Sequence, residues 1–429
     1  MRNIFTTNGK NEVDVLFCIE HFDREIEVVI ELTRLLCKQK LSVGIASTIF
    51  HIYEIANKIK PRVVVTASTA FGKNSVGSLL YERYGQSIKF VNLNYEQFIS
   101  SWKGDYKSTK SAFAKEHQTQ LVWGEYYKKI LIESGFNRDN IHITGRPHLK
   151  YLKNRYDSVN KKSAELLSKV GLNTDKKTIF IALTDGLAFA KPEKIDYIIS
   201  QGAIEHELRD SIRIIKSNLH ELFRQISEFD GLDVQFVLRP HPSVPTSKYE
   251  DIFKEQLRLE KVPENVSILK DYDAYTWLMI SDCFITNYST LCIEAGALGV
   301  PTFAFQCKGE SLGKGVWYMN SIQTIEHVSA SLEQQTLKFK TNNYYMDFEL
   351  DGIELTIKAL LRQLSQSKAC FSNKMPLVFR KRILGSLARR FAVKYDMLIG
   401  MMPRTQGLVN DYFNHETIMK KLQELEADV

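Results

Sequence analysis

Short apolar runs alternate with segments of helical period along most of this chain. In the first half, runs with the length and composition of buried strands lie at residues 13–19, 41–47, 63–67, 88–93, 120–123 and 141–144. Between them, the spacing of apolar residues predicts helices such as 25–38 and 126–134. This alternation favours parallel sheets built from β-α units.

A second series of the same kind follows after a break. Its predicted strands are 178–183, 234–238, 266–269 and 283–286, and its predicted helices are 205–228, 247–257 and 274–281. Residues from about 150 to 177 are polar and charged without a strand signal, which predicts a crossing between domains.

The two series predict an α/β protein of two doubly wound, Rossmann-like domains that face one another across a cleft. We expect a first domain at 1–155, a second at 156–370 and a basic amphipathic helical tail at 371–429. In such domains ligands bind at the carboxyl ends of the strands. The ends of the predicted strands are therefore the places to look for chemistry.

The stretch from Cys283 to Phe305 carries the strongest such candidate. A predicted strand runs into Asn287, and a helix begins near Ser289 and Thr290. Backbone N–H groups at a helix start attract anions, and small hydroxyls approach a phosphate closely. Glu294 lies one turn further along the same face, where it is placed to reach sugar hydroxyls. We hypothesise a nucleotide-sugar site; the alternative is that Ser289 is merely an N-cap residue.

The strand at 234–238 delivers a second candidate, the sequence Arg239-Pro240-His241-Pro242. The two prolines fix φ on either side of His241 and stop both strand and helix pairing. An imidazole held beside an arginine suits a phosphate or a departing nucleotide. A single histidine is more often structural, but the position at a strand end favours function here.

Three carboxylates and an arginine follow other predicted strands. Glu96, on the loop after 88–93, is placed to remove a proton from an acceptor hydroxyl. Asp185 would serve as a cleft carboxylate or as a turn residue. Glu20 and Arg24 would bind acceptor groups or would simply pair with each other.

No metal site is predicted. Asp271 and Asp273 have the spacing of a metal-binding pair, but Asp273 precedes the predicted helix 274–281 and suits an N-cap. The ten histidines form no HExxH pattern and no cluster with the six cysteines at metal spacing. With no CxxC pair, the cysteines indicate buried free thiols in a reducing compartment.

The bulk properties are those of a soluble globular protein of 429 residues, with 44% hydrophobic and 25% charged residues. The amino terminus lacks an apolar signal region and no run is long enough to span a bilayer, so we expect a cytoplasmic protein. The net charge of +7 is a mild excess that attracts anions.

Residues 375–404 mix basic and apolar side chains. They predict either an amphipathic segment on an anionic membrane surface or a helix that packs back on the first domain. The basic residues there are not interleaved with aromatics that would stack on bases, so we expect no nucleic-acid partner.

Together these motifs resemble a known group of proteins. Arg-Pro-His-Pro at 239–242, with Ile-Thr-Asn-Tyr-Ser-Thr at 285–290 and Glu294, resembles the GT-B-type transferases of bacterial surface polysaccharides. These include capsule and O-antigen enzymes with CMP-sugar donors and the related CDP-glycerol polyol-phosphate transferases. Three motifs of the amino half resemble the same surface carbohydrate proteins: Ile19-Glu20 followed by Arg24-Glu25, Gln120-Leu-Val-Trp-Gly-Glu125 and Ile143-Thr-Gly-Arg-Pro147. The resemblance covers roughly 13–305.

The resemblance implies a GT-B-like, metal-independent glycosyltransferase that moves a sugar from a nucleotide-activated donor to an acceptor hydroxyl. CMP- or CDP-linked donors are favoured and UDP-linked donors are the alternative, with no other cofactor. The acceptor would be a glycan or lipid-linked glycan at the inner face of the cytoplasmic membrane. By this resemblance the donor residues are His241, Ser289 and Thr290, and the positions at the strand ends and the helix start add Arg239, Asn287 and Glu294. We also expect His241 to act in catalysis, Glu20 and Arg24 to lie on the acceptor side, and Glu96, or alternatively Asp185, to be the base.

Other functions fit the same patterns. A CDP-polyol phosphotransferase or a nucleotide-sugar 2-epimerase would use the same scaffold. A non-catalytic, membrane-associated assembly protein would use the basic tail alone.

Overall fold

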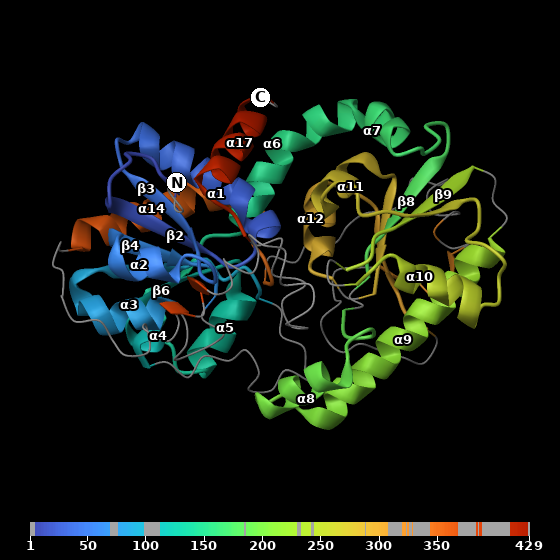
Figure 1. The fold of residues 1–429 in the computed structure, drawn as a ribbon, viewed down its shortest axis with the longest axis horizontal. Coiled ribbons are helices and arrows are strands. Elements are labelled where there is room, and N and C mark those ends of the chain that lie inside the picture. Colours follow the sequence, from blue (N-terminus) through green and yellow to red (C-terminus); the bar gives the residue numbers. More distant parts are fainter. Residues whose placement is uncertain are drawn as a thin grey trace. The chain divides into compact units, whose positions relative to one another are not determined.

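The computed structural model describes residues 5–68, 76–97, 112–183, 186–229, 233–241, 244–287, 289–307, 320–322, 324, 325, 328, 344–367, 383–384, 386–387 and 412–427. The chain divides into two compact units (Figure 1). The first unit comprises Met1–Gln97, Lys107–Tyr151 and Asn343–Val429. The second unit comprises Phe98–Tyr106 and Leu152–Asn342.

The first unit is built on a seven-stranded sheet in the order β1-β3-β2-β4-β5-β6-β7. The pairs are parallel except for β1, which is antiparallel to β3. The strands are β1 Phe5–Thr6, β2 Glu12–Ile19, β3 Val43–Ser47, β4 Lys60–Thr66, β5 Lys89–Asn92, β6 Gln118–Val122 and β7 Ile141–Ile143.

Seven helices belong to the described part of this unit. They are α1 Phe22–Lys38, α2 Ile52–Asn57, α3 Val76–Tyr84, α4 Ala112–His117, α5 Glu125–Glu133, α14 Gly352–Gln366 and α17 His415–Ala427. The chain passes from the first unit to the second within α6 Pro147–Lys161, between Tyr151 and Leu152, and α7 Ser163–Lys169 follows in the second unit. The segment expected as a crossing is therefore helical, and its buried Leu152 and Val159, seven residues apart, are the helical signal that its polar composition masked.

The second unit is built on a six-stranded parallel sheet in the order β10-β9-β8-β11-β12-β13. The strands are β8 Lys177–Ile181, β9 Val234–Leu238, β10 Val266–Ile268, β11 Cys283–Thr286, β12 Thr302–Phe305 and β13 Asn320–Ile322. Chain order runs outward in both directions from β8, so a topological switch point lies between β8 and β11.

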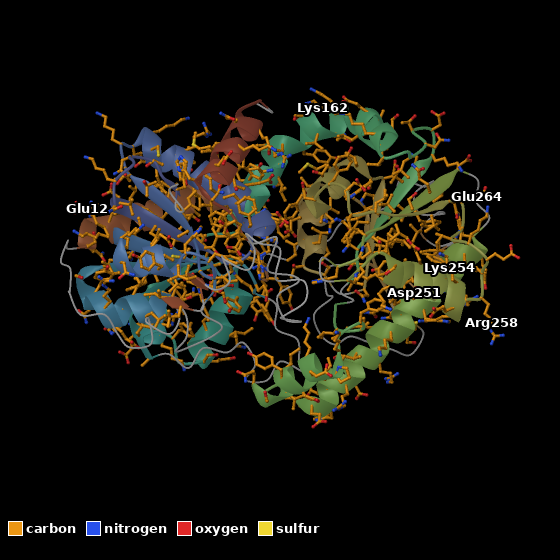
Figure 2. All side chains as sticks on the ribbon, in the orientation of Figure 1. Glu12, Lys162, Asp251, Lys254, Arg258 and Glu264 are labelled. Carbon is orange, nitrogen blue, oxygen red and sulfur yellow. The ribbon has the colours of Figure 1, made fainter. Side chains whose placement is uncertain are left out.

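The described helices of this unit are α8 Pro192–Ser200, α9 Glu205–Glu228, α10 Ser247–Asp251, α11 Ala274–Ile280 and α12 Leu291–Ala297. After α10 the chain continues as a π-helical turn, Ile252–Gln256. The charged side chains of Asp251 and Lys254 lie on the outer face (Figure 2), whereas Ile252 and Phe253 are buried in the core. Predicted elements 205–228, 234–238 and 283–286 coincide with α9, β9 and β11.

The predicted boundary of the second domain at residue 370 differs from the structure. Helix α14 packs against β4, β5 and α1 of the first unit. Its buried residues Ile353, Ile357, Leu360 and Leu364 form one apolar face at helical spacing. Such a face indicates burial against a sheet but does not specify which sheet, so local pattern could not place this helix.

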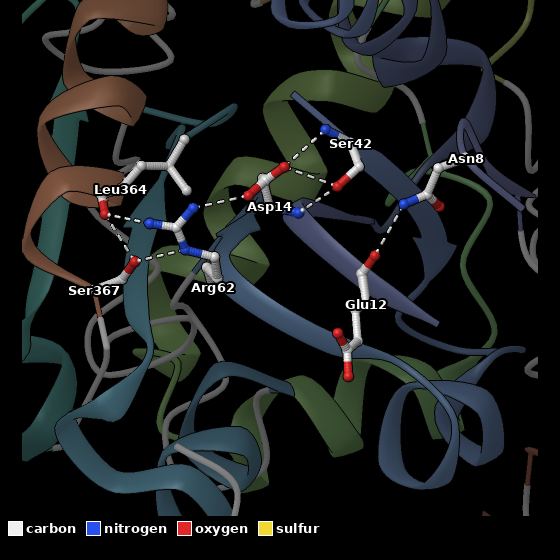
Figure 3. A network of polar contacts seen from close by, with 7 residues as sticks. All are labelled: Asn8, Glu12, Asp14, Ser42, Arg62, Leu364 and Ser367. Carbon is white, nitrogen blue, oxygen red and sulfur yellow. Dashed lines mark hydrogen bonds and ion pairs between the residues drawn. The ribbon is translucent and has the colours of Figure 1, made fainter. Parts of the chain in front are cut away.

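Arg62 fastens the end of α14 to the first sheet (Figure 3). Its Nη1 donates to Asp14 Oδ1 at 2.9 Å, Nη2 donates to the Leu364 carbonyl at 3.0 Å and Nε donates to Ser367 Oγ at 3.2 Å. Asp14 also accepts from the backbone N–H of Ser42 at 2.9 Å. The contact joins residues about 300 positions apart in the chain.

Residues 344–351, which we call the return strap, lead into α14 across two glycine-containing loops. The Tyr126 N–H donates to the Tyr344 carbonyl at 2.8 Å, and the Asp347 N–H donates to the Trp123 carbonyl at 2.9 Å. A Cβ placed on Gly124 would lie 2.8 Å from the Tyr344 carbonyl oxygen. This glycine therefore allows the strap backbone to lie against the loop after β6.

The loop after β7 meets the strap in the same way. Gly145 has a φ of 70°, and a Cβ there would lie 3.1 Å from Leu350 Cβ. A Cβ on Gly352, where the strap ends, would lie 2.6 Å from the Arg146 carbonyl carbon. The return strap thus packs against the Trp-Gly and Gly-Arg-Pro motifs of the amino half, which we call its seat.

The described part of the tail also packs on the first unit. Phe413 contacts the rings of Phe22 and His51, each with ring centroids 5.1 Å away, and Lys421 forms an ion pair with Glu27 at 3.1 Å. Within the predicted amphipathic segment 375–404, Ser386 Oγ donates to the Phe50 carbonyl at 2.7 Å. Most of that segment lies outside the described residues. In the part of the chain that the structure describes, no helix is long and apolar enough to cross a membrane.

Candidate functional site

The carboxyl edge of the second sheet gathers the residues predicted to bind a nucleotide donor. Arg239 follows β9 and Asn287 follows β11, and these strands pair with β8 from opposite sides. Because neighbouring strands lie about 4.8 Å apart, the two strand ends are roughly 10 Å apart. They therefore border the switch point, where doubly wound sheets bind ligands.

Arg239 is held by its neighbours on both sides. Its N–H donates to the Ile181 carbonyl at 2.9 Å, and its Nη2 donates to the Tyr272 carbonyl at 3.2 Å. Tyr272 has a φ of 57°, an unusual value for a tyrosine. The Tyr272 hydroxyl donates to the Leu166 carbonyl at 3.0 Å, which anchors the loop that fixes Arg239.

His241 is exposed at this edge. Its carbonyl accepts from the Val244 N–H at 2.8 Å, which turns the chain after the strand. A Cβ built on Gly186, in the loop after β8, would lie 3.2 Å from His241 Nδ1. The imidazole thus lies against the loop that follows the central strand. Asp185, next to Gly186, lies outside the described residues.

Ser289 and Thr290 precede α12, and both are half-buried. The N-cap residue of α12 is Thr290 rather than Ser289, and Ser289 Oγ accepts from the N–H of Leu291, the first residue of the helix, at 3.2 Å. A hydroxyl that accepts a hydrogen bond still has its own proton to donate, so this contact leaves Ser289 able to donate to an anion. Asn287 and Glu294 are buried, at 0% and 1% exposure.

Asp273 is the N-cap residue of α11, as its position before the predicted helix indicated. Asp273 Oδ1 accepts from the N–H groups of Tyr275 and Thr276 at 2.8 and 2.9 Å, and its Oδ2 accepts from the Thr276 hydroxyl at 2.8 Å. Both carboxylate oxygens are therefore used to cap α11. Among the described residues, no three His, Cys, Asp or Glu side chains form a group that could hold a metal ion.

A hollow of about 600 Å³ lies elsewhere in the second unit. It includes none of the predicted site residues among its lining, which consists of Ser217, His220, Glu221, Arg224, Gln225, Cys307 and Thr324.

In the first unit, Arg24 links two carboxylates. Its Nη1 lies 3.2 Å from Glu96 Oε1 and its Nη2 lies 3.2 Å from Glu25 Oε1. Glu25 also accepts from the N–H groups of Glu20 and His21 at 3.1 and 3.0 Å. The loop after β2 and the loop after β5 are thereby joined through one guanidinium.

Glu25 is the residue of this group to which the sequence analysis gave no role. Its side chain is 1% exposed, and burial raises the pKa of its carboxyl although Arg24 and the two N–H donors oppose the shift. Burial would lower the pKa of Arg24, but Glu25 and Glu96 more than offset this and raise it. The acidic first turn of the predicted helix was the available signal for Glu25.

The chain was compared with proteins of known sequence and structure. No protein-family model matches it. A teichoic acid poly(glycerol phosphate) polymerase of Staphylococcus epidermidis is 23% identical over 238 residues, which are 54% of this chain and 27% of that relative. The chain thus matches about a quarter of the length of this curated relative.

Solved structures establish the fold. The UDP-GlcNAc 2-epimerase of Methanocaldococcus jannaschii, solved with UDP-GlcNAc and UDP, superimposes with a TM-score of 0.51 at 14% identity, covering 82% of this chain and 99% of that one. The wall teichoic acid polymerase TagF aligns over 89% of this chain and 90% of that chain at 15% identity, with a TM-score of 0.44 that carries no inference. The two doubly wound units therefore form a GT-B-like α/β fold, which confirms the predicted fold class.

Proposed function

We propose that this protein is a glycosyltransferase that moves a sugar from a nucleotide-activated donor to an acceptor hydroxyl during assembly of a bacterial surface polymer. The observation that carries the proposal is that β9, which leads to Arg239 and His241, and β11, which leads to Asn287, Ser289 and Thr290, flank β8 at the switch point of the second sheet. The match to a teichoic acid polymerase supports the polymer, and the shared fold of a UDP-GlcNAc enzyme supports a nucleotide donor.

In this proposal the second unit binds the donor. The Arg239 guanidinium, the His241 imidazole and the hydroxyls of Ser289 and Thr290 contact its phosphate, and Glu294 binds ribose hydroxyls. Hydrogen-bonding and charged groups that stabilise the negative charge developing on the departing nucleotide lower the barrier to transfer. This electrostatic stabilisation is usually the largest contribution to catalysis. No metal ion is required for these contacts.

The first unit supplies the acceptor side. Glu96 takes the proton of the acceptor hydroxyl, whose oxygen forms a bond to the sugar carbon of the donor. The bond from that carbon to the phosphate oxygen breaks, and its electron pair leaves with the nucleotide. Arg24 and Glu20 orient the acceptor, and Asp185 is the alternative base.

The acceptor and its setting follow from the same proposal. A glycan or lipid-linked glycan of capsule or O-antigen type would be extended at the inner face of the cytoplasmic membrane. The side chains of Leu384 and Leu387, within the basic segment 375–404, are 69% and 42% exposed and support peripheral contact with anionic lipid. We expect the protein to prefer CMP- or CDP-linked donors over UDP-linked donors.

Two alternatives have specific support. The polymerase relative favours transfer of a polyol phosphate from a CDP-linked donor. The epimerase structure favours conversion of the donor without any acceptor. Analysis of products with and without acceptor separates all three reactions. Only an epimerase changes the donor sugar when no acceptor is present, and of the two transferases only the polyol-phosphate transferase adds phosphorus to the acceptor.

A thermal-shift panel of CMP, CDP, UDP and GDP, with and without Mg²⁺ or Mn²⁺, tests the donor assignment. A nucleotide at a hundred times its dissociation constant should stabilise the fold by about 2.7 kcal/mol. His241→Ala should remove most of this stabilisation and abolish transfer, because it deletes the imidazole proposed to contact the phosphate. Since His241 is exposed, the variant should still fold. Stabilisation and turnover equal to those of the wild-type protein in this variant would refute the donor site.

A further inference from the structure

The loop that carries Glu96, residues 93–97, exposes one side chain and buries the others. Leu93, Asn94, Tyr95 and Gln97 are all buried, whereas the Glu96 side chain is 42% exposed. A short loop at the edge of a sheet ordinarily exposes several side chains to water. We call residues 93–97 the Glu96 loop.

The backbone of the Glu96 loop is tied to the neighbouring strand end. The Leu93 N–H donates to the Thr66 carbonyl at 2.9 Å, and the Tyr95 N–H donates to the Ala67 carbonyl at 3.1 Å. Asn94 lies between them with a φ of 48°, in the left-handed region that asparagine tolerates better than most residues. The loop thus has a defined and sharply turned backbone.

The amide side chains of Asn92, Asn94 and Gln120 hydrogen-bond to this turn and to one another. The Asn94 N–H donates to Asn92 Oδ1 at 3.2 Å, and Asn92 Nδ2 donates to Asn94 Oδ1 at 2.7 Å and to Gln120 Oε1 at 2.9 Å. Asn94 Nδ2 donates to Gln120 Oε1 at 3.1 Å and to the Leu121 carbonyl at 3.2 Å. The turn of β5 is therefore hydrogen-bonded to β6 by side chains as well as by the sheet.

Gln97 fastens the other end of the loop. Its Nε2 donates to the Asn94 carbonyl at 3.1 Å, and its Oε1 accepts from the Trp123 N–H at 2.9 Å. Asn92, Asn94, Gln97 and Gln120, which we call the amide ladder, are each at most 3% exposed. Buried amides destabilise a fold unless they are paired, so a fully paired set specifies one geometry.

We propose that Asn94 and Gln97 are positioning residues that hold the Glu96 carboxylate in its reactive place opposite Arg24. This inference rests on the proposed function, in which Glu96 deprotonates the acceptor. A side chain that must meet a hydroxyl works best when the residues around it are already fixed. The amide ladder holds Asn94 and Gln97, on either side of the residue that would react, and backbone hydrogen bonds to the end of β4 hold Leu93 and Tyr95.

The test compares Gln97→Leu with Gln235→Leu. Gln235 is also a buried glutamine that holds a turn, accepting from the Asn173 N–H at 3.0 Å and donating to the Asn173 carbonyl at 2.7 Å, but it lies at the amino edge of the second sheet. Both variants should lose stability. Gln97→Leu should also lower kcat by about 10- to 100-fold per folded molecule with the donor KM unchanged, because a shift of about 1 Å in a reactive group has effects of this size.

Asn94→Gly and Asn94→Ala separate the backbone from the amide. Glycine keeps the left-handed turn and removes only the side chain, whereas alanine removes both. We expect kcat to fall with glycine and to fall further with alanine. Wild-type kcat in Asn94→Gly would mean that the turn alone matters, and would overturn the role of the Asn94 amide.

Hydrogen exchange of the Glu96 loop distinguishes failure of this inference from failure of the proposed function. In one outcome, Gln97→Leu exchanges faster at 93–97 with unchanged kcat and Glu96→Gln keeps full activity. The loop would then be ordered around a residue that is not the base. Loss of activity in Glu96→Gln with wild-type kcat in Gln97→Leu would keep the base and refute the positioning role. A fall in kcat of equal size in Gln235→Leu would also overturn the inference.

Discussion

The Glu25 carboxyl is buried beside Arg24, and burial raises its pKa above the ordinary value of 4.5. Between the unfolded and folded pKa values the folded protein binds more protons than the unfolded chain. The contribution of this group to stability is therefore fully present below the unfolded pKa and is lost as the pH rises through the folded pKa. The contribution of the Glu25 carboxyl to stability therefore decreases from mildly acidic pH towards neutrality.

Glu25→Gln tests this at the scale of one residue. The amide does not titrate, and its single oxygen replaces only one of the two acceptors that the carboxylate offers to the N–H groups of Glu20 and His21. The stability lost with that hydrogen bond does not depend on pH. The wild-type free energy of unfolding minus that of the variant should fall as the pH is raised from about 4 towards neutrality. Urea unfolding at several pH values measures this difference, and a difference that rises with pH would contradict the raised pKa.

Residue-level patterns also mark how far the sequence could predict the candidate site. Strand ends were sufficient to find Arg239, His241 and Asn287, because a strand end is a local feature. The pairing of Arg24 with Glu96, 72 positions apart, could not be read from either segment. Both residues follow strands, but only the assembled sheet shows that β2 and β5 are separated by β4 alone.

At the scale of elements, the return strap explains the glycines of the amino half. Gly124 and Gly145 belong to motifs that resemble surface carbohydrate proteins, and a resemblance of this kind suggests ligand contact. The structure instead places the backbone of 344–351 against both glycines. A Cβ would lie 2.8 Å from the Tyr344 carbonyl oxygen at Gly124 and 3.2 Å from the Asp347 carbonyl oxygen at Gly145. These glycines therefore have a structural reason that does not involve a substrate.

Gly145→Ala and Gly171→Ala form a matched pair for the strap. Both glycines have a positive φ, of 70° and 78°, so alanine is strained at both by roughly 1–2 kcal/mol. Only at Gly145 would the new Cβ meet neighbours, at 3.1 Å from Leu350 Cβ and 3.2 Å from the Asp347 carbonyl oxygen. Gly145→Ala should therefore lower the free energy of unfolding by about 1 kcal/mol more than Gly171→Ala does. It should also speed hydrogen exchange at 344–351. Equal stability and equal exchange in the two variants would refute the seat.

At the scale of the whole molecule, the chain returns to its first unit after building the second. Helix α14 and the segment 412–427 both belong to the first unit, together with its amino-terminal sheet (Figure 1). The core of that unit is therefore completed only when the end of the chain is present. The donor residues proposed above lie in the other unit and do not share this dependence.

Phe413→Ala should lower the stability of the first unit without changing donor binding by the second unit. Phe413 is 1% exposed, and its loss should destabilise the protein by about 3 kcal/mol through the cavity left against Phe22 and His51. Met419→Ala, at a residue 39% exposed in the neighbouring α17, is the control and should have little effect. The thermal shift produced by the donor nucleotide should be the same in both variants, and its loss in Phe413→Ala alone would contradict a donor site confined to the second unit.

The sequence by itself determined the parallel α/β class, most strands and the longest helix, because these depend on apolar periodicity within a few residues. It also determined that polar side chains stand at the ends of β9 and β11. Only the tertiary structure decided the order of the strands, the unit to which α14 belongs and the partners of Arg24 and the amide ladder. Each of these depends on contacts between segments far apart in the chain, for which a local pattern carries no partner information.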